Sequence, residues 1–244
     1  KPYEPAAFRP PEIGTFMHYV LEKTAREVKR RGGFAAVDDK TLRELCDRAV
    51  AQYVSEELND FNEKSRRFIY LFKRLCGDVW RVVEDMAAEL RRSDFEPLDF
   101  ELDFSDAREM PPVELGGGED SLVLSGIADR VDGWYHDGKL YLRVVDYKTG
   151  YKKFSMSDVW YGMGLQMLLY LFALEANGGG RYDCEVLPAG VIYVPARSRI
   201  LNMQSDADES AVDKERVSEQ RRSGLVRKDA AVIEAWEHGD DKRY

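Results

Sequence analysis

Apolar side chains recur every three or four residues along the first third of the chain, which is the spacing of helices with one buried face. Residues 13–31 follow this pattern and end at a pair of glycines, which commonly stop helices. Asp38-Asp39 supplies a plausible cap for a second helix that runs to about residue 58. A third and longer pattern covers residues 63–91. Three helices are therefore expected before any strand.

The pattern changes after the third expected helix. Residues 96–104 read as a strand, and residues 105–120 read as a loop because they contain paired prolines and three consecutive glycines. Residues 155–176 are apolar on nearly all sides and predict a buried helix, which the glycine run that follows would end. Residues 185–195 predict a further strand. Between the loop and the buried helix lies a predicted β-hairpin.

The expected order is three helices, then three strands, a helix and another strand. This order predicts an α/β fold with a mixed central β-sheet flanked by helices and an N-terminal helical layer. A length of 244 residues suits a single domain with a helical part (1–94), an α/β core (95–200) and a polar helical tail (201–244). The tail is expected to hold one helix around residues 209–222 and a weaker one near 230–237.

A tight turn is predicted at Asp137-Gly138, since Asp-Gly between alternating apolar residues is a strong signal for a two-residue hairpin. Counting back along both strands from this turn places Asp129 directly across from Asp146. The same register makes an ion pair of Asp132 and Arg143. It also matches Val131 with Val144, Trp134 with Tyr141, Tyr135 with Leu140 and Ile127 with Lys148. A shift by one residue would lose these matches.

Asp129 and Asp146 would face one another with Cβ atoms about 5 Å apart, where like charges are destabilising. Two carboxylates so placed need a cation between them or must share a proton. Lys148 projects from the same face of the strand, two residues after Asp146. Two acids and a lysine on one face suit a divalent-metal site that cleaves phosphodiesters. The alternative is that both aspartates are solvated acids at strand ends.

In such a site Asp129 and Asp146 would hold one or two magnesium ions (Mg²⁺), and the carbonyl of Tyr147 is a further candidate ligand. The ions would lower the pKa of a bound water and neutralise the scissile phosphate. Lys148 could orient the attacking water or stabilise charge in the transition state. These roles predict a hydrolytic site.

Two other groups of residues have two open interpretations each. Gln166 and Tyr170 stand four residues apart on one helix face, so they could present polar groups to a substrate strand or be packed in the core. Glu101 could join the site, or its alternation with Asp99 and Asp103 could mark a solvent-facing edge.

The formal net charge of −9 argues against a protein that coats nucleic acid indiscriminately, but it allows a nuclease whose DNA contacts are local. A basic group near the two aspartates could hold phosphates or be an ordinary solvated surface. Its members are Lys139, Arg143, Lys148, Lys152 and Lys153. No apolar run approaches the roughly 18 residues that cross a bilayer, so no membrane partner is expected.

The three cysteines are Cys46, Cys76 and Cys184, which lie far apart and form no CxxC or Cys/His cluster. They predict neither a zinc site nor a disulfide framework, and they fit a reducing cytoplasm. The chain begins at Lys1 rather than Met, which suggests a segment of something longer.

Four short motifs are informative as a set. They are Gly14 to His18, Gly126 to Asp132, Asp146 to Gly150, and Gln166 to Tyr170. Together they resemble the nuclease domain of the RecB family, within the PD-(D/E)XK superfamily. The resemblance is strongest to the B subunits of AddAB-type ATP-dependent helicase–nucleases. It implies helices around a mixed central sheet.

The resemblance also implies roles for single residues. His18, Asp129 and Asp146 would bind the metal, Mg²⁺ or Mn²⁺, while Lys148 assists catalysis. His18 thereby becomes an expected ligand, although its helix alone would make it a half-buried packing residue. Gln166 and Tyr170 would sit beside the site and support DNA engagement.

The implied activity is that of a metal-dependent deoxyribonuclease (exonuclease) acting on single-stranded DNA during double-strand-break repair and recombination. The implied partner is a helicase-bearing nuclease subunit of the AddA type. An iron–sulfur cluster is expected for the full-length family, but its cysteines are not matched in this chain. Two alternatives stay open, namely a catalytically inactive DNA-binding or scaffolding module with the nuclease fold, and a stand-alone exonuclease of the same superfamily.

Overall fold

The computed structural model describes residues 8–58, 61, 64–105, 110–111, 114–115, 122–123, 125–150, 153–196 and 221–239. The chain divides into two compact units. The first, called the helical unit, holds residues 1–91, 148–151 and 195–219, and the second, called the sheet unit, holds residues 92–147, 152–194 and 220–244. The expectation that residues 1–244 form one nuclease domain stays a prediction.

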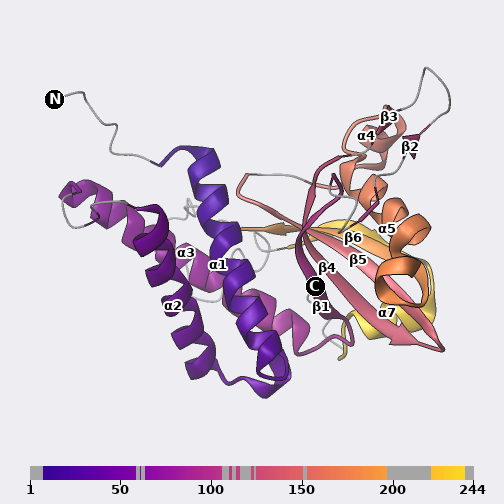
Figure 1. The fold of residues 1–244 in the computed structure, drawn as a ribbon, viewed down its shortest axis with the longest axis horizontal. Coiled ribbons are helices and arrows are strands. Elements are labelled where there is room, and N and C mark those ends of the chain that lie inside the picture. The colour runs from indigo at the N-terminus through magenta and orange to yellow at the C-terminus, as the bar shows by residue number, and fades with distance from the viewer. Residues whose placement is uncertain are drawn as a thin grey trace, which may run out of the picture. The chain divides into compact units, whose positions relative to one another are not determined.

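The described part of the helical unit contains three long helices (Figure 1) together with residues 148–150 and 195–196. The helices are α1 (Pro10–Arg30), α2 (Asp39–Glu57) and α3 (Arg66–Leu90), with a short 3₁₀ turn, η1 (Phe34–Ala36), between the first two. The side chain of Asp38 accepts a hydrogen bond of 2.7 Å from the Thr41 amide, which confirms the predicted cap of α2. The three expected helices are therefore confirmed.

The central sheet has the strand order β1-β4-β5-β6-β7 and belongs to the sheet unit, except for Lys148 and Pro195 at the ends of two strands. These strands are β1 (Glu96–Asp103), β4 (Ile127–His136), β5 (Lys139–Lys148), β6 (Glu185–Pro195) and β7 (Ser223–Val226). The β1–β4, β4–β5 and β6–β7 pairs are antiparallel. The amide of Ala196, just after β6, donates to the carbonyl of Lys148 at the end of β5. The ends of β5 and β6 therefore meet at one edge, so these two strands run parallel and the predicted mixed sheet is confirmed.

Helices cover both faces of this sheet. Helix α5 (Gln166–Tyr182) packs Leu168 and Leu171 into a buried cluster with Val131 and Val144. On the opposite face, Trp236 of α7 (Ala230–Trp236) lies over the guanidinium of Arg143 at 4.8 Å. The expected fold class, an α/β sheet flanked by helices with an N-terminal helical part, is confirmed. No helix in the described part of the chain has both the length and the apolar character of a membrane span.

The prediction of one buried helix over residues 155–176 is wrong. The structure has a short α4 (Met156–Trp160) and then α5, with Gly162 (φ 78°) and Gly164 (φ 67°) between them. Positive φ angles are incompatible with a right-handed helix, so the two glycines interrupt it. The later glycines do not end α5, which runs through them to Tyr182. A Cβ on Gly178 would lie 3.1 Å from Val186, so glycine allows a close approach between the helix and β6.

The tail also differs from the expectation of a purely helical segment. Its residues Ser223–Val226 form strand β7 against β6, and a Cβ on Gly224 would lie 2.0 Å from the carbonyl oxygen of Val191. Glycine therefore permits a backbone contact that the polar composition did not reveal. The weaker predicted helix is confirmed as α7, whereas residues 209–220 lie outside the described residues. The expected loop over 105–120 also lies largely outside them, apart from β2 (Glu114–Leu115), which pairs with β3 (Leu122–Val123).

Candidate metal-binding site

The β4–β5 hairpin has the register predicted from its turn. Asp137 and Gly138 have φ angles of 49° and 74°, as a two-residue hairpin turn of this kind requires. The predicted pairs within the ladder are all present: Val131 with Val144, Asp132 with Arg143, Trp134 with Tyr141, and Tyr135 with Leu140. The ladder ends at Arg130 and Val145, so the facing of Asp129 with Asp146, one residue further along each strand, stays a prediction, as does that of Ile127 with Lys148.

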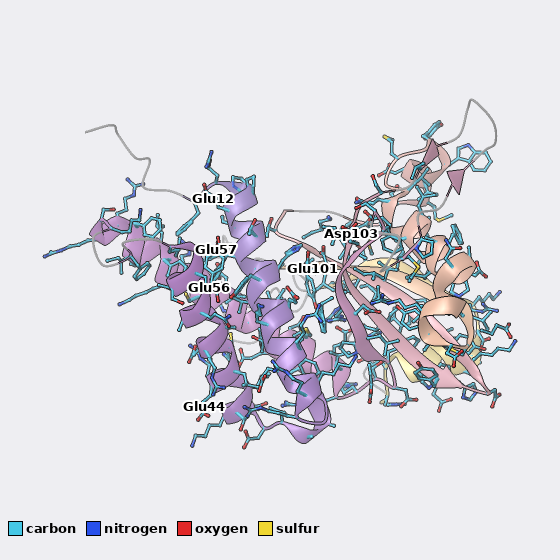
Figure 2. All side chains as sticks on the ribbon, viewed as in Figure 1. Glu12, Glu44, Glu56, Glu57, Glu101 and Asp103 are labelled. Carbon is cyan, nitrogen blue, oxygen red and sulfur yellow. The ribbon has the colours of Figure 1, made fainter. Side chains whose placement is uncertain are left out.

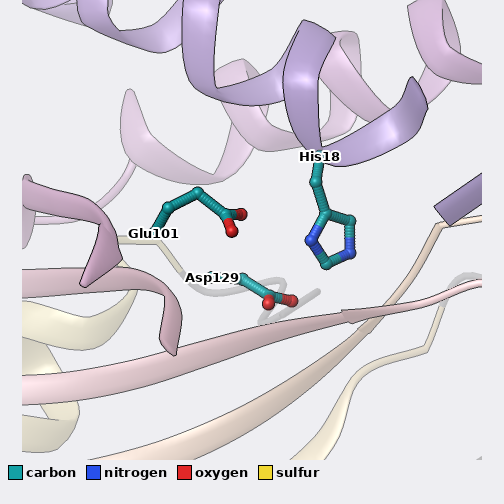
Figure 3. A group of neighbouring side chains, drawn as sticks. All are labelled: His18, Glu101 and Asp129. Atoms are coloured by element: carbon teal, nitrogen blue, oxygen red, sulfur yellow. The ribbon is translucent and has the colours of Figure 1, made fainter. Parts of the chain in front are cut away.

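Strand β1 brings a third carboxylate to this row. Its ladder with β4 pairs Phe100 with Arg130 and Leu102 with Ala128, which places Glu101 opposite Asp129. One carboxylate oxygen of Glu101 and one of Asp129 lie within 4.8 Å of each other. Figure 3 shows the two side chains near one another. Three adjacent strands thus carry Glu101, Asp129 and Asp146, of which the first two lie close together, and we call these three residues the acidic row.

Glu101 has a left-handed backbone, with φ at 51°, in the middle of a strand. For a residue with a side chain this conformation costs roughly 1–2 kcal/mol. Such strained positions cluster at functional sites, where the surrounding structure enforces them. The two other non-glycine residues with positive φ in the described part of the chain are Asp137, in the hairpin turn, and Asp183, at the end of α5. Glu101 therefore stands apart from positions where the conformation is common.

The acids beside Glu101 on β1 have other roles, so the solvent-edge interpretation does not describe the three residues alike. Asp99 accepts hydrogen bonds of 2.6 Å from both Arg181 and Tyr182. Asp103 accepts from the amide and the hydroxyl of Ser105 at 2.7 and 2.6 Å. Glu101, between them, is half-buried, and Figure 2 labels it together with Asp103. The alternating sequence could not separate these roles.

Asp129 is tied to the neighbouring strand by a short hydrogen bond. The amide of Tyr147 donates to its Oδ2 at 2.6 Å, a charge-assisted bond of the strong type. Tyr147 lies between Asp146 and Lys148 at the end of β5. The bond therefore holds the Asp129 side chain at the peptide that follows Asp146. Asp129, Asp146 and Lys148 are all half-buried.

Asp146 also influences the adjacent strand β6. Burial raises the pKa of the Tyr193 phenol, and the negative charge of Asp146 raises it further. The Tyr193 side chain is 3% exposed, so the charge acts in a poorly hydrated environment. The Asp146 carboxylate is thus close enough to β6 for its charge to act on this buried phenol.

Gln166 and Tyr170 are bonded to each other. The Gln166 amide donates to the Tyr170 hydroxyl at 2.7 Å, and the Tyr170 ring stacks on Phe104 with centroids 4.6 Å apart. Tyr170 is 1% exposed, whereas Gln166 is exposed at the start of α5. Tyr170 therefore follows the core interpretation, while the Gln166 amide remains accessible. DNA engagement by the pair stays a prediction.

Gly126 explains why two of the sequence motifs belong together. A Cβ at this position would lie 1.9 Å from the Tyr170 hydroxyl, and its φ of 146° is itself unfavourable for other residues. The missing side chain lets the Tyr170 hydroxyl reach the strand that leads to Asp129. The motifs around Gly126 and Tyr170 are thus in direct contact.

The expected basic group does not form as predicted. Arg143 is 0% exposed and pairs with Asp132 on the opposite face from the acidic row. Lys139 lies at the turn and pairs with Glu185 at 3.0 Å, while Lys152 lies outside the described residues. The prediction that Arg143 could bind phosphate is therefore wrong, because the alternation of the strand directs its side chain into the core.

The donor set of the sheet unit fits a hard divalent cation. Carboxylate oxygens are the ligands that Mg²⁺ and Mn²⁺ prefer. Like charges that face one another across strands are destabilising without a cation or a shared proton. His18 lies half-buried on α1 in the helical unit, and its role as a ligand stays a prediction, as does that of the Tyr147 carbonyl.

Comparisons with known proteins find relatives that share one name. A protein of Acetivibrio thermocellus, named as the B subunit of an ATP-dependent helicase/deoxyribonuclease, is 37% identical over 234 residues, which are 93% of this chain and 20% of that protein. Proteins of the same name from Clostridium acetobutylicum and Clostridium novyi are 31% and 33% identical, over 92% and 93% of this chain and 20% of each relative. The chain thus spans about a fifth of the length of these relatives.

A family model covers almost the whole sequence. It is described as the PD-(D/E)XK nuclease superfamily and matches residues 1–241. The mixed sheet and the spacing of Asp146 and Lys148 on β5 are in keeping with this match. The chain belongs to the PD-(D/E)XK nuclease superfamily.

Proposed function

We propose that this chain is the metal-dependent nuclease domain of a helicase–nuclease, hydrolysing single-stranded DNA as an exonuclease during double-strand-break repair. The observation that supports this most directly is the acidic row, which ends on the strand that also bears Lys148. Family membership and the names of the relatives support the same activity. We place the reaction in the cytoplasm, which the separated cysteines favour.

Asp129 and Asp146 are proposed as the principal metal ligands, with Mg²⁺ or Mn²⁺ as the ion. Glu101 extends the oxygen donor set from β1, and the Tyr147 carbonyl is a further candidate. His18 is proposed as a nitrogen ligand on the strength of the family resemblance. A bound divalent ion would lower the pKa of a coordinated water and neutralise charge on the scissile phosphate.

Lys148 is proposed to act on the reacting groups themselves. Its ammonium can donate to the attacking water or to a phosphate oxygen, where negative charge grows in the transition state. The exposed amide of Gln166 is proposed to contact the DNA strand, held in place by its bond to the buried Tyr170 hydroxyl. Both roles use side chains that are half-buried or exposed, so substrate can reach them.

The partner proposal follows from the relatives. Their name describes the B subunit of an ATP-dependent helicase/deoxyribonuclease, so we propose a helicase-bearing nuclease subunit of the AddA type as the partner. An iron–sulfur cluster is expected in the full-length family, and its cysteines are not matched here. Two rival functions are an inactive DNA-binding module and a stand-alone exonuclease.

Cleavage of a fluorescently labelled single-stranded oligonucleotide tests the proposal. We expect cutting in Mg²⁺ or Mn²⁺ that a chelator abolishes. Asp146→Ala should lower the rate at least about a thousandfold, or roughly 4 kcal/mol of transition-state stabilisation, with the circular dichroism spectrum unchanged. The matched control is Asp137→Asn, which removes an 87% exposed carboxylate from the same hairpin.

Each rival predicts a different result. An inactive module would bind the oligonucleotide without cutting it in either metal. A stand-alone exonuclease would degrade long duplex DNA without ATP or a second subunit. Full activity of the Asp146→Ala protein would remove the acidic row from the mechanism.

A further inference from the structure

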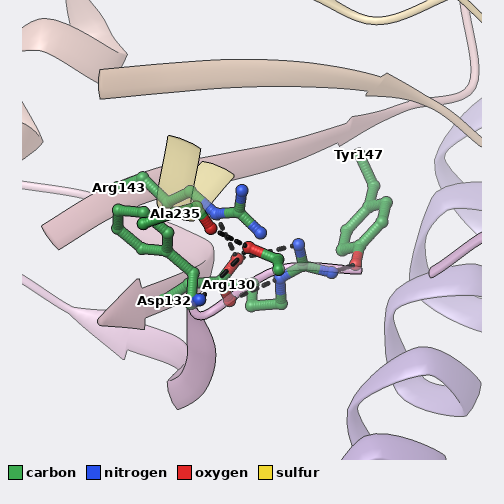
Figure 4. A network of polar contacts seen from close by, with 7 residues as sticks. Arg130, Asp132, Arg143, Tyr147 and Ala235 are labelled. Carbon is green, nitrogen blue, oxygen red and sulfur yellow. Dashed lines mark hydrogen bonds and ion pairs between the residues drawn. The ribbon is translucent and has the colours of Figure 1, made fainter. Parts of the chain in front are cut away.

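The face of the β4–β5 hairpin opposite the acidic row contains a buried ionic network (Figure 4). It consists of Arg130, Asp132 and Arg143, each with a side-chain exposure of 0%. Oδ1 of Asp132 forms an ion pair with Nε of Arg130 at 2.7 Å. Oδ2 of Asp132 accepts hydrogen bonds from Nη2 of Arg130 at 2.9 Å and from Nε of Arg143 at 2.8 Å. We call these three residues the Arg–Asp–Arg network.

The network is held on two sides. The guanidinium of Arg143 lies over the rings of Phe95 and Trp236, 4.8 Å from each centroid, and these two rings also contact each other. At the other end, Arg130 donates a hydrogen bond from Nη1 to the hydroxyl of Tyr147, as Figure 4 shows. The Tyr147 side chain is 5% exposed, so this bond is shielded from water. The Arg130 guanidinium is therefore held by Asp132 on one side and by the Tyr147 hydroxyl on the other.

Tyr147 connects this network to the acidic row. Its hydroxyl is bound by Arg130 on one face of the sheet, and its amide donates to Asp129 on the other at 2.6 Å. The β4–β5 backbone ladder runs from His136 and Lys139 to Arg130 and Val145. Tyr147 lies two positions past the last of these ladder residues on β5. Its bonds to Arg130 and Asp129 therefore connect β4 and β5 beyond the end of the backbone ladder.

Stability alone is a weak reason for such a network. Burying charges removes their hydration, and replacing a buried ionic group with apolar residues of similar volume is often neutral or stabilising. Here two cations and one anion are buried together. A planar guanidinium with several donors in fixed directions can, however, hold a neighbouring group in a defined position.

We propose that Arg130 and Tyr147 are positioning residues for the metal site. The Arg–Asp–Arg network fixes the Tyr147 peptide, and this peptide sets the spacing of Asp129 from Asp146 and Lys148. The inference rests on the proposed function, because it concerns the geometry of the same site. A displacement of about 1 Å at a reacting group can lower a rate about a hundredfold, so a second layer of contacts is consequential.

Tyr147→Phe is the direct test, because it removes the hydroxyl and keeps both the ring and the Asp129 bond. We expect Mn²⁺ affinity, measured by isothermal titration calorimetry on the purified protein, to fall by about tenfold. We expect kcat on single-stranded DNA to fall by about ten- to a hundredfold, with KM for DNA changed less than about twofold. All measurements are made at temperatures where unfolding curves show both proteins to be folded.

Tyr141→Phe is the matched control. Tyr141 lies on the same strand and the same face, near the turn, and its ring contacts Trp134 at 5.3 Å. Losing that hydroxyl should leave Mn²⁺ affinity and kcat unchanged. Arg130→Lys keeps the charge but not the fork of donors, and it should weaken Mn²⁺ binding in the same direction as Tyr147→Phe.

The metal-binding measurement separates this inference from the proposed function. If the parent protein binds Mn²⁺ but cuts no DNA, the nuclease proposal fails, while the affinities of the variants still decide the positioning role. Parent-like Mn²⁺ affinity in Tyr147→Phe, even with a lowered unfolding temperature, would reduce the network to a structural role and overturn the inference. Failure of the parent to bind Mn²⁺ at millimolar concentration would overturn it as well.

Discussion

The two faces of the β4–β5 hairpin give their aspartates different electrostatic environments. On one face Asp132 is fully buried, and two guanidinium groups from the same sheet unit neutralise it. On the other face Asp129 is half-buried, with Glu101 within 4.8 Å and Asp146 predicted to lie opposite it on β5. The first arrangement pairs charges of opposite sign, with one positive charge in excess, whereas the second gathers charge of one sign.

This difference predicts that substitutions on the two faces have different effects on stability. Removing one member of a buried ion pair leaves a charge without compensation, so the network on the first face is sensitive to substitution. A group of carboxylates is destabilising until a cation joins it, and active sites often retain such unfavourable arrangements. The comparison therefore predicts large losses of stability on one face and small ones on the other.

The largest effect is expected for Asp132→Ala. The substitution would leave Arg130 and Arg143 buried without their shared anion, and we expect a loss of roughly 3–5 kcal/mol in the free energy of unfolding. Urea denaturation followed by circular dichroism would measure it. Glu185→Gln, which breaks the exposed pair with Lys139, is the control and should cost less than about 1 kcal/mol. A loss below about 1 kcal/mol for Asp132→Ala would contradict the contrast between the faces.

An intermediate effect is expected for Gly126→Ala. The new Cβ would meet the Tyr170 hydroxyl and the backbone would be held at an unfavourable φ, so we expect a loss of about 1–3 kcal/mol, measured by the same urea denaturation. Gly180→Ala is the matched control, since Gly180 lies in α5 with open space around it, and it should stabilise the protein by about 0.5–1 kcal/mol.

A double variant sharpens the same measurement. Adding Tyr170→Phe to Gly126→Ala removes the clashing hydroxyl and should recover part of the lost stability. Strictly additive losses in the double variant would show that the clash is not the cause.

The smallest effect is expected for Glu101→Gln. Because it removes a negative charge from the acidic row without changing the side-chain volume, the free energy of unfolding in metal-free buffer should change by less than about 1 kcal/mol. Mg²⁺ should raise the unfolding temperature of the parent protein more than that of the variant. An equal Mg²⁺ shift in both proteins would exclude Glu101 from the donor set.

Several features of the site were predictable because they depend on local geometry. The Asp137-Gly138 turn and the alternation of the flanking strands are sufficient to set the hairpin register, including the Asp132–Arg143 pair. The Asp38 cap was predictable for the same reason, because it bonds three residues along the chain. Identification of the superfamily likewise needed only the motifs.

Other features depend on residues that are far apart in the sequence. The alternation of acids on β1 could not distinguish Glu101 from Asp99, which is bound by Arg181 on α5. The sequence made Arg143 a candidate phosphate ligand, whereas the structure buries it against Phe95 and Trp236, which are distant in the sequence. Strand β7 was missed because its residues form a strand only against β6.

By itself, the sequence determined which residues face one another across the hairpin, since a two-residue turn leaves the paired strands a single matching register. The tertiary structure alone decided that Glu101 joins the acidic row, through the pairing of β1 with β4 and a backbone that local preference disfavours. It also decided that Tyr147 links the two faces of the sheet. Contacts of this kind form only when distant segments are packed together, so no local pattern of side chains can encode them.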